Sequence, residues 1–434
     1  MPKQMNVTRR SFLKTAAVGG AIVGLPAIVP SSVFGAEAPS ERITMGFIGV
    51  GGRGSGLLRA FMGLKDAHVL AACDVKKQQR DRAKSWIDKK YGTNSCIAYN
   101  DFRELCARDD IDAVVSATTD HWHVLTALQA VRSGKDVYVE KPLGMSVEQG
   151  QVLRDTVQRY GRVFQFGTQE RSNRNTRFAC EMALSERVGK IHTVTVASRF
   201  SHASPNYPTQ PVPDWLDYDM WLGAAPWEPY TENRVRNMGG WFHISDYALG
   251  FIAGCGIHTV DMAQWGGGTE LTGPLEIEGF GEFPSDGLCN CATGWDVKMK
   301  FANGVTMRFT DGKRNPMGVR FEGPDGWVFV KEGHLGGRPD ANPKSLLREP
   351  IGPGEVHLPV STHHQQNFLD CIKTRARTIA PVEVAVRSDT LVQLSDIAMR
   401  LGRKLKWDPD KEQFIGDEHA DGMLKRPMRP PWRL

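Results

Sequence analysis

The stretch ITMGFIGVGGRGSGLLRAFMGL, residues 43–64, decides the fold of this chain. Its first eight residues are an unbroken apolar run, which is typical of a buried parallel strand, and its second half has the composition of a helix. A glycine-rich turn of the form G-x-G-x-x-G joins the two and predicts a cradle for the phosphates of a dinucleotide. The candidate cofactor-binding residues in this turn are Gly49, Gly51, Gly52, Arg53 and Gly54.

A carboxylate follows the next predicted strand at the distance that such a site requires. Residues 68–75 form a second apolar run, and Asp74 stands 20 residues after Gly54. An acidic residue here accepts hydrogen bonds from the ribose hydroxyls and repels a 2′-phosphate, so NAD is the expected cofactor. Lys76 and Lys77 keep NADP open as an alternative. A glycine-rich loop in an α/β fold without a nucleotide is the structural alternative.

The strand and helix pattern repeats until about residue 165. Such alternation predicts a doubly wound parallel sheet, and thus a Rossmann domain over residues 41–165. Further strands are expected at residues 111–119, 136–142 and 162–169, and helices at 76–91, 124–133 and 147–160.

From residue 166 the pattern changes to alternating strands. In residues 295–311, Asn303-Gly304 joins two alternating runs, which predicts an antiparallel hairpin. Residues 319–330 predict a second hairpin around Pro324. Residues 166–434 are therefore expected to form an α+β domain for substrate binding and oligomerisation, with a large, mostly antiparallel open sheet. The Pro- and aromatic-rich segment 201–230 is expected to line a pocket or a subunit contact.

The N-terminal residues 1–38 have the organisation of a twin-arginine export signal. TRRSFLK, residues 8–14, contains the arginine pair Arg9-Arg10, and an apolar segment of small residues follows it. We expect recognition by the twin-arginine translocase, cleavage near Ala36 or Ala38, and a periplasmic or otherwise exported protein. An uncleaved membrane anchor is the alternative.

Charge and cysteine content exclude other classes of protein. Loss of the four basic residues of the leader lowers the formal net charge from +5 to +1, or to +2 if Glu37 leaves too, which argues against a nucleic-acid partner. The eight cysteines are scattered and indicate no disulfide framework. Cys289 and Cys291 are the only close pair, so we expect no metal site and mostly buried thiols.

Two motifs then follow the ends of predicted parallel strands, where ligands bind in such sheets. TTDHWH (residues 118–123) supplies Thr118 and His123, and VEKPLG (residues 139–144) supplies Glu140 and Lys141. With the glycine turn, these motifs make the mature chain resemble the Gfo/Idh/MocA oxidoreductases. The resemblance implies a nicotinamide-dependent oxidoreductase that acts on a pyranoside, sugar or polyol hydroxyl. It also implies cofactor contacts for these four residues and a catalytic role for Lys141 beside nicotinamide and substrate; a solvated surface lysine is the alternative.

The second-domain motif IAGCGIHTVD, residues 252–261, departs from the family pattern. Relatives commonly read Asp-x-Gly-x-His here, whereas this chain has Gly254 in place of the aspartate. His258 is kept and is the expected proton acceptor, since imidazole titrates near neutral pH; a core histidine is the alternative. The resemblance places Gln169, Arg171 and Asp261 near the substrate. The upstream segment HISDY offers His243, Asp246 and Tyr247 in place of the missing carboxylate, with Asp246 preferred.

Three functions stay open at this point. The first is net oxidation of a carbohydrate hydroxyl. The second is a glycoside hydrolase, lyase or epimerase that oxidises its sugar transiently, although exported glycosidase relatives carry a changed Glu-Lys-Pro segment. The third is a non-catalytic sugar-binding protein. The twin-arginine route carries folded proteins, so export with a cofactor predicts that NAD is tightly bound and regenerated on the enzyme. An exposed sheet face predicts a homodimer or tetramer.

Overall fold

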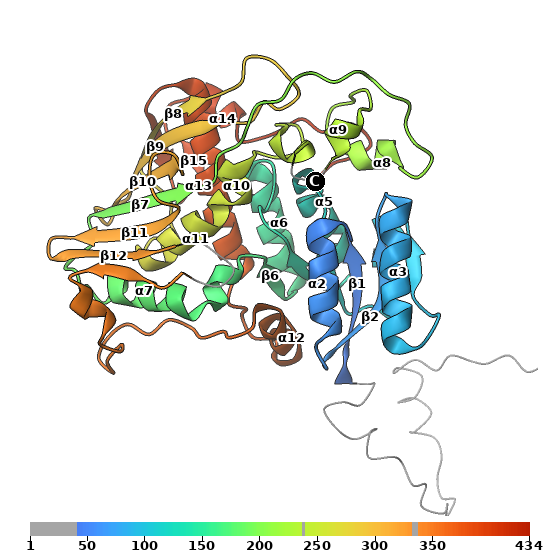
Figure 1. Ribbon diagram of the computed structural model, residues 1–434, viewed down its shortest axis with the longest axis horizontal. Helices are drawn as coiled ribbons and strands as arrows, with labels where there is room; N and C mark the ends of the chain where they lie inside the picture. Colours follow the sequence, from blue (N-terminus) through green and yellow to red (C-terminus); the bar gives the residue numbers. More distant parts are fainter. Residues whose placement is uncertain (1–40, 237–238, 332–336) are drawn as a thin grey trace, which may run out of the picture. The chain divides into compact units, whose positions relative to one another are not determined.

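The computed structural model describes residues 41–236, 239–331 and 337–434 (Figure 1). The predicted export signal, residues 1–38, lies outside the described residues. From Ile43 to Leu434 the chain forms one compact unit that contains two sheets. The predicted boundary between residues 165 and 166 falls inside the last strand of the first sheet.

The first sheet has six parallel strands in the order β3-β2-β1-β4-β5-β6. This order confirms the predicted Rossmann fold, and it puts the reversal of winding between β1 and β4, where dinucleotides bind. The strands are β1 (Ile43–Ile48), β2 (Ala67–Cys73), β3 (Ile97–Tyr99), β4 (Ala113–Ser116), β5 (Asp136–Val139) and β6 (Phe164–Phe166).

The connecting helices agree with the sequence except at one start. The helix predicted from residue 124 begins at Asp120, so the DHWH motif lies on its first turn. Thr119 is the N-cap and Asp120 puts a negative charge at the helix N-terminus, a pattern that the apolar periodicity alone did not indicate. The helices are α2 (Gly52–Met62), α3 (Lys77–Tyr91), α4 (Phe102–Cys106), α5 (Asp120–Arg132) and α6 (Val147–Tyr160).

The second sheet has nine strands in the order β13-β12-β11-β7-β10-β9-β8-β14-β15. All its pairs are antiparallel except β7 with β10, which confirms the predicted sheet. Both predicted hairpins form, with Met299 opposite Met307 and Gly323 opposite Gly326. The strands are β7 (Thr193–Ser198), β8 (Glu276–Glu282), β9 (Gly294–Lys300), β10 (Thr306–Asp311), β11 (Gly318–Gly323), β12 (Gly326–Val330), β13 (Asp340–Asn342), β14 (Leu405–Asp408) and β15 (Gln413–Phe414).

Helices α7 and α11 pack against strands of the second sheet, and α13 packs between β8 and α6 of the first region. In the part of the chain that the structure describes, no helix has both the length and the apolar character needed to cross a membrane. The remaining helices are η3 (Gln169–Ser172), α7 (Arg174–Leu184), α8 (Tyr218–Leu222), α9 (Glu232–Val235), η4 (Trp241–His243), α10 (Phe251–Gly254), α11 (Gly256–Gly266), η5 (Lys344–Leu347), α12 (His364–Thr374), α13 (Val382–Leu401) and α14 (Glu418–Gly422).

Helix α12 returns from the far end of the sequence to the first sheet (Figure 1). Its Phe368 packs edge-on against Phe61 and Tyr138, with ring centroids 6.4 and 5.9 Å apart. Just beyond the helix, the Phe166 amide at the end of β6 donates a hydrogen bond of 2.8 Å to the Ala380 carbonyl. The core of the nucleotide-binding fold is therefore completed by residues more than 200 positions downstream.

The eight cysteines lie within the described residues and form no disulfide. All are buried apart from Cys255, which is half-buried. Burial raises the pKa of several of these thiols, and it raises that of Cys96 to about 11. The expectation that the cysteines act mostly as small buried apolar residues is confirmed.

Candidate dinucleotide and substrate site

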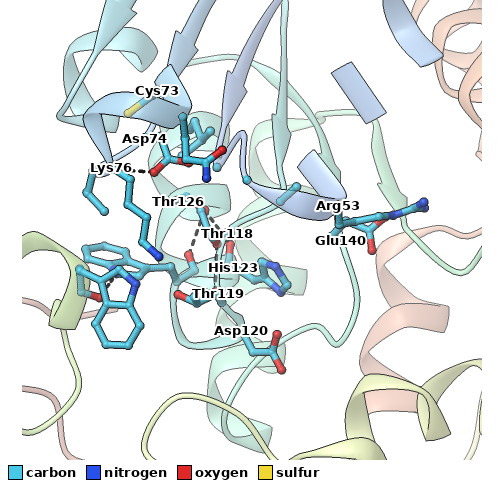
Figure 2. A pocket seen from close by; sticks show the side chains of 18 of the residues that line it. Arg53, Cys73, Asp74, Lys76, Thr118, Thr119, Asp120, His123, Thr126 and Glu140 are labelled. Atoms are coloured by element: carbon cyan, nitrogen blue, oxygen red, sulfur yellow. Dashed lines mark hydrogen bonds and ion pairs between the residues drawn. The ribbon is translucent and has the colours of Figure 1, made fainter. Parts of the chain in front are cut away.

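A pocket of about 450 Å³ lies at the carboxyl ends of the first sheet's strands. Figure 2 shows its side chains running from Asp74 past Thr118 and His123 to Asp120. It brings together both predicted motifs and the glycine turn with aromatic residues from beyond β7. Its lining includes Gly49, Gly51, Gly52, Arg53, Asp74, Asn100, Thr118, Asp120, His123, Glu140, Lys141, Met220, Trp221, Trp241 and Phe242.

The glycine turn has the shape that a phosphate cradle needs. Gly49 has φ +79°, a conformation that L side chains rarely adopt. A Cβ on Gly54 would lie 1.9 Å from the Gly49 carbonyl oxygen, so only glycine lets the helix start so close to the strand. A Cβ on Gly51 would meet nothing within 4 Å, which is the open side of the turn. Backbone amides there are free to approach a pyrophosphate.

Asp74 is held in place beside this turn. Its carboxylate accepts hydrogen bonds from the Val50 amide at 3.0 Å and the Lys76 amide at 2.9 Å. Burial raises the pKa of Asp74, and these two amides oppose that rise. The remaining lone pairs of the carboxylate are placed to accept ribose hydroxyls.

The two lysines that left NADP open are occupied elsewhere. The Lys76 ammonium donates to the Val235 carbonyl at 2.9 Å, and Lys77 forms an ion pair with Asp81 one turn along α3. A 2′-phosphate would have to compete with these contacts and with the Asp74 charge. The geometry at this end of the pocket therefore fits NAD better than NADP.

Segment 201–230 covers the same end of the pocket. The Lys77 amide donates to the Trp215 carbonyl at 2.8 Å, and the Asp217 amide donates to the Val75 carbonyl at 3.1 Å. The Asp217 carboxylate accepts from the Asn100 side chain at 2.7 Å. Because Met220 and Trp221 of this segment line the pocket, the prediction that it lines a pocket is confirmed.

Arg53 and Glu140 form one side of the site. The Arg53 Nε donates to Glu140 Oε1 at 2.8 Å, and the buried Glu140 also accepts from the Lys141 amide at 3.2 Å. Arg53 Nη2 donates to the Gln169 side chain at 3.4 Å. The Glu140 carboxylate thus binds both the glycine turn, through Arg53, and the loop that carries Lys141. Gln169 contacts Arg53.

His123 presents an acceptor atom to the pocket. Its Nδ1 lies 2.6 Å from the Pro142 carbonyl, which can only accept, so this nitrogen carries the proton. Burial lowers the pKa of His123 to about 4, and the ring is therefore neutral near pH 7. Within the described residues its Nε2 has no hydrogen-bond partner. That lone pair suits a hydroxyl of a bound ribose.

Lys141 reaches across to the second region of the chain. Its ammonium donates to the Gly254 carbonyl at 2.6 Å, at the end of α10. A Cβ on Gly254 would lie 2.0 Å from Cζ of Phe242, so the Phe242 ring fills the space that a family aspartate side chain would need. His258 follows one helical turn later on α11 and is 7% exposed.

Arg171 and Asp261 do not face this pocket. They form a buried ion pair with distances of 2.7 and 2.8 Å, and they are 2% and 0% exposed. Arg171 also pairs with Glu270 and lies over the Trp265 ring, while Asp261 accepts from Ser388. The expectation that both contact substrate is corrected: their charges satisfy each other in the interior.

Asp246 and Tyr247 also lie apart from Lys141. Tyr247 is fully buried, and its hydroxyl accepts from Arg234 at 3.2 Å. Asp246 lines a different pocket, together with Arg400 and Arg426. Neither replaces the missing aspartate. Both were expected near the substrate because HISDY precedes the histidine motif in sequence, but neither lines the pocket that contains Lys141.

Several pocket residues had no sequence signal of their own. Trp221, Trp241 and Phe242 come from the short helices α8 and η4, whose position depends on long-range contacts. Asp120 lies inside TTDHWH, four residues before the start of the helix that the sequence predicts. An acidic residue directly after a Thr N-cap is a helix-start signal that would have placed it at the strand end, inside the site.

Comparison with known families agrees with this architecture. The family described as "Oxidoreductase family, NAD-binding Rossmann fold" matches residues 43–168, and "Oxidoreductase family, C-terminal alpha/beta domain" matches residues 195–434, more than half of the chain.

The chain is also similar to individual proteins. It is 37% identical over 172 residues to an alpha-N-acetylgalactosaminidase of Shewanella oneidensis, and this match covers 36% of the chain and 38% of that relative. An aldose-aldose oxidoreductase of Caulobacter crescentus, complexed with glycerol, superposes with a TM-score of 0.60 at 18% identity, covering 84% of this chain and 99% of that one. The WlbA dehydrogenase of Bordetella pertussis, in complex with NADH and UDP-GlcNAcA, gives a TM-score of 0.60 at 16% identity, covering 85% and 99%.

These structural likenesses are below 25% identity and establish the fold. The two family matches, together with a pocket that joins the glycine turn, Asp74 and Lys141, establish the family as well. The chain belongs to the Gfo/Idh/MocA family of NAD-binding oxidoreductases.

Proposed function

We propose that this protein holds NAD tightly and uses it to oxidise a hydroxyl group of a carbohydrate. The observation that carries the proposal is the single pocket in which the phosphate cradle, Asp74, His123 and Lys141 meet. Bound NAD supplies a hydride acceptor there. The glycine turn would hold the pyrophosphate, and Asp74 and His123 would accept from ribose hydroxyls.

Lys141 is the proposed residue that binds the reacting hydroxyl and helps it to lose its proton. Its ammonium is fixed by the Gly254 carbonyl and its backbone amide by Glu140, so a substrate oxygen that enters the pocket meets an oriented donor. The aromatic wall of Trp221, Trp241 and Phe242 offers flat apolar surfaces, which suit the C–H faces of a sugar ring and exclude water.

Tight retention of the cofactor is supported by the cover that segment 201–230 forms over Asp74. Export by the twin-arginine route is proposed from residues 1–38, and it is consistent with a cofactor that must travel inside the folded protein. A homodimer or tetramer is proposed on the same footing, from the open second sheet.

A second candidate function is glycoside cleavage through transient oxidation. The partial similarity to an alpha-N-acetylgalactosaminidase favours it, and an exported enzyme with a captive cofactor would gain from a reaction without net redox change. Oxidation of a ring hydroxyl acidifies the neighbouring C–H bond, so that elimination of the aglycone needs only the same proton-transfer groups. The intact Glu-Lys-Pro segment at 140–142 favours net oxidation over this second function, because exported glycosidase relatives carry a changed segment there.

Denaturing the purified protein tests the cofactor. Protein prepared without added nucleotide should release about one NAD per chain, measured by chromatography of the supernatant. An empty supernatant from well-folded protein would refute tight binding. Incubation with p-nitrophenyl α-N-acetylgalactosaminide then separates the candidates. Release of p-nitrophenolate without accumulation of NADH indicates cycling, whereas NADH absorbance that grows with added NAD indicates net oxidation.

Replacement of Lys141 tests its role. We expect Lys141→Ala to keep its bound NAD and to lose substrate-dependent reduction of that NAD by roughly 100-fold or more, the usual scale for a proton-transfer group. Stopped-flow absorbance of the bound nicotinamide measures this rate. Lys190→Ala, a change at an exposed lysine, is the matched control. Unchanged reduction in the Lys141 variant would exclude the assignment.

A further inference from the structure

We propose that Asp120 is the carboxylate that accepts the substrate's hydroxyl proton in this chain, in place of the aspartate that Gly254 removes. The inference rests on the proposed function and names a further catalytic residue for it. Asp120 is the first residue of α5 and lines the same pocket as Lys141. Figure 2 shows its side chain at the end of the pocket opposite Asp74.

The state of the Asp120 side chain distinguishes it from an ordinary surface carboxylate. It is 2% exposed, and its Oδ2 has no hydrogen-bond partner among residues 41–236, 239–331 and 337–434. An unsatisfied buried carboxylate oxygen is costly, and such groups are rare outside functional sites. A bound hydroxyl group that donates to Oδ2 would remove this cost.

The other acidic groups nearby are already occupied. Glu140 accepts from Arg53 and from the Lys141 amide, and Asp389 accepts from the Leu143 amide and the Gln393 side chain. Asp261 is paired with Arg171 in the interior. Of the carboxylates considered for the missing role, Asp120 is the one that combines a place in the pocket with an unoccupied oxygen.

The surroundings of Asp120 favour the protonated form of its carboxyl group more than water does. Burial raises the pKa of Asp120 well above its ordinary value, and Glu140 and Asp389 add to the rise, while the Lys141 ammonium opposes it. His121 and His123 on the same helix are neutral, because burial lowers the pKa of each to about 4. A carboxyl group poised in this way is an effective acid and base.

The step balances with the cofactor as the redox partner. The C–H hydrogen leaves with two electrons as hydride to the nicotinamide, the O–H proton moves to the Asp120 carboxylate, and the carbon–oxygen bond becomes a carbonyl. Lys141 holds the oxygen through both changes. On reduction, the Asp120 carboxyl group returns the proton.

Infrared spectroscopy of the NAD-loaded protein tests the proposal without any substrate. Difference spectra between acid and alkaline pH should contain a carboxylic acid C=O band that Asp120→Asn removes and that Asp155→Asn, an isosteric change at an exposed carboxylate, keeps. The burial that raises the pKa of Asp389 to about 7 predicts a second band, which both variants retain. If Asp120→Asn keeps every carboxylic acid band of the wild type, the proposal is overturned.

A kinetic measurement gives an independent readout. Asp120→Asn and Asp120→Ala should bind NAD normally and reduce it at least about 100-fold more slowly with a glycoside that the wild type oxidises, and the pH dependence of that rate should flatten. Equal rates in the wild type and in variants that keep their NAD would overturn the proposal. If the wild type oxidises no glycoside, the proposed function fails, and the infrared band alone decides the role of Asp120.

Discussion

Gly254 changes which groups surround Lys141 in the site. The Phe242 ring occupies the space beside it, and its bare carbonyl accepts the Lys141 ammonium. An aspartate at this position would both clash and compete for that ammonium. The loss of the family carboxylate is therefore built into the packing and is accompanied by an unoccupied carboxylate on the opposite wall.

Restoring the aspartate should consequently damage the protein. We expect Gly254→Asp to lower the free energy of unfolding by roughly 1–3 kcal/mol, the usual cost of overpacking, and to reduce activity. The double variant Gly254→Asp/Phe242→Ala should recover part of that stability, because the second change makes room. Urea unfolding of both single variants and the double variant measures the coupling. Wild-type stability of Gly254→Asp would contradict the close contact.

The residues that sequence reasoning placed correctly are those whose role depends on local pattern. Gly49, Gly51 and Asp74 follow from one strand, one turn and the next strand, and the structure brings them into one pocket. Arg171 and Asp261 were misplaced because their pairing joins positions 90 residues apart, which no local pattern reveals. A charged residue near a motif looks the same in sequence whether its partner is a substrate or another side chain.

At the scale of elements, the segment around α8 covers the end of the pocket that contains Asp74. Asp217 caps this helix by accepting from the Met220 amide at 3.0 Å, and the same carboxylate holds Asn100 of the nucleotide-binding fold. The sequence indicated that this segment lines a pocket, but not which pocket. Its path over β2 and α3 depends on backbone contacts at Trp215 and Asp217, which carry no side-chain signature.

Removing the contacts of Asp217 should weaken retention of the cofactor. We expect Asp217→Ala to weaken the packing of α8 over the pocket by about 1–2 kcal/mol, since it removes the helix cap and the Asn100 contact together. Bound NAD should then leave roughly tenfold faster. NAD remaining after timed dialysis measures the rate. Asp214→Ala, at an exposed position of the same segment, should release NAD at the wild-type rate. Equal retention by both variants would mean that α8 does not hold the cofactor in place.

At the scale of the whole molecule, buried neutral histidines set the response to acid. Burial lowers the pKa of His121, His123 and His364 to about 4 each, while in an unfolded chain these groups titrate near 6.5. Between these values the unfolded state binds more protons than the folded state. Stability is therefore fully present above about pH 6.5 and falls as the pH drops toward 4.

The size of this acid response can be checked at one residue. Each buried histidine should contribute roughly 3 kcal/mol of pH-dependent stability over that interval. His364 donates from Nε2 to the Phe166 carbonyl at 2.8 Å, a bond that the side-chain amide of His364→Gln can reproduce. Thermal unfolding from pH 4 to 8 should show a shallower slope for this variant. If the stability of the variant falls with pH as steeply as that of the wild type, His364 does not contribute to the acid response.

The return of α12 to the first sheet has a consequence for synthesis. The ribosome makes β1 to β6 with α2 and α3 first, but Phe368 and its neighbours, which complete the cover of one apolar face of that sheet, are added more than 200 residues later. At ordinary rates of translation this delay is roughly 10–40 s, during which part of that face stays uncovered. We expect a chaperone to bind the exposed apolar surface during that interval. A nucleotide-binding fragment cut after β6 would expose the same face, so a soluble version of it needs α12 attached.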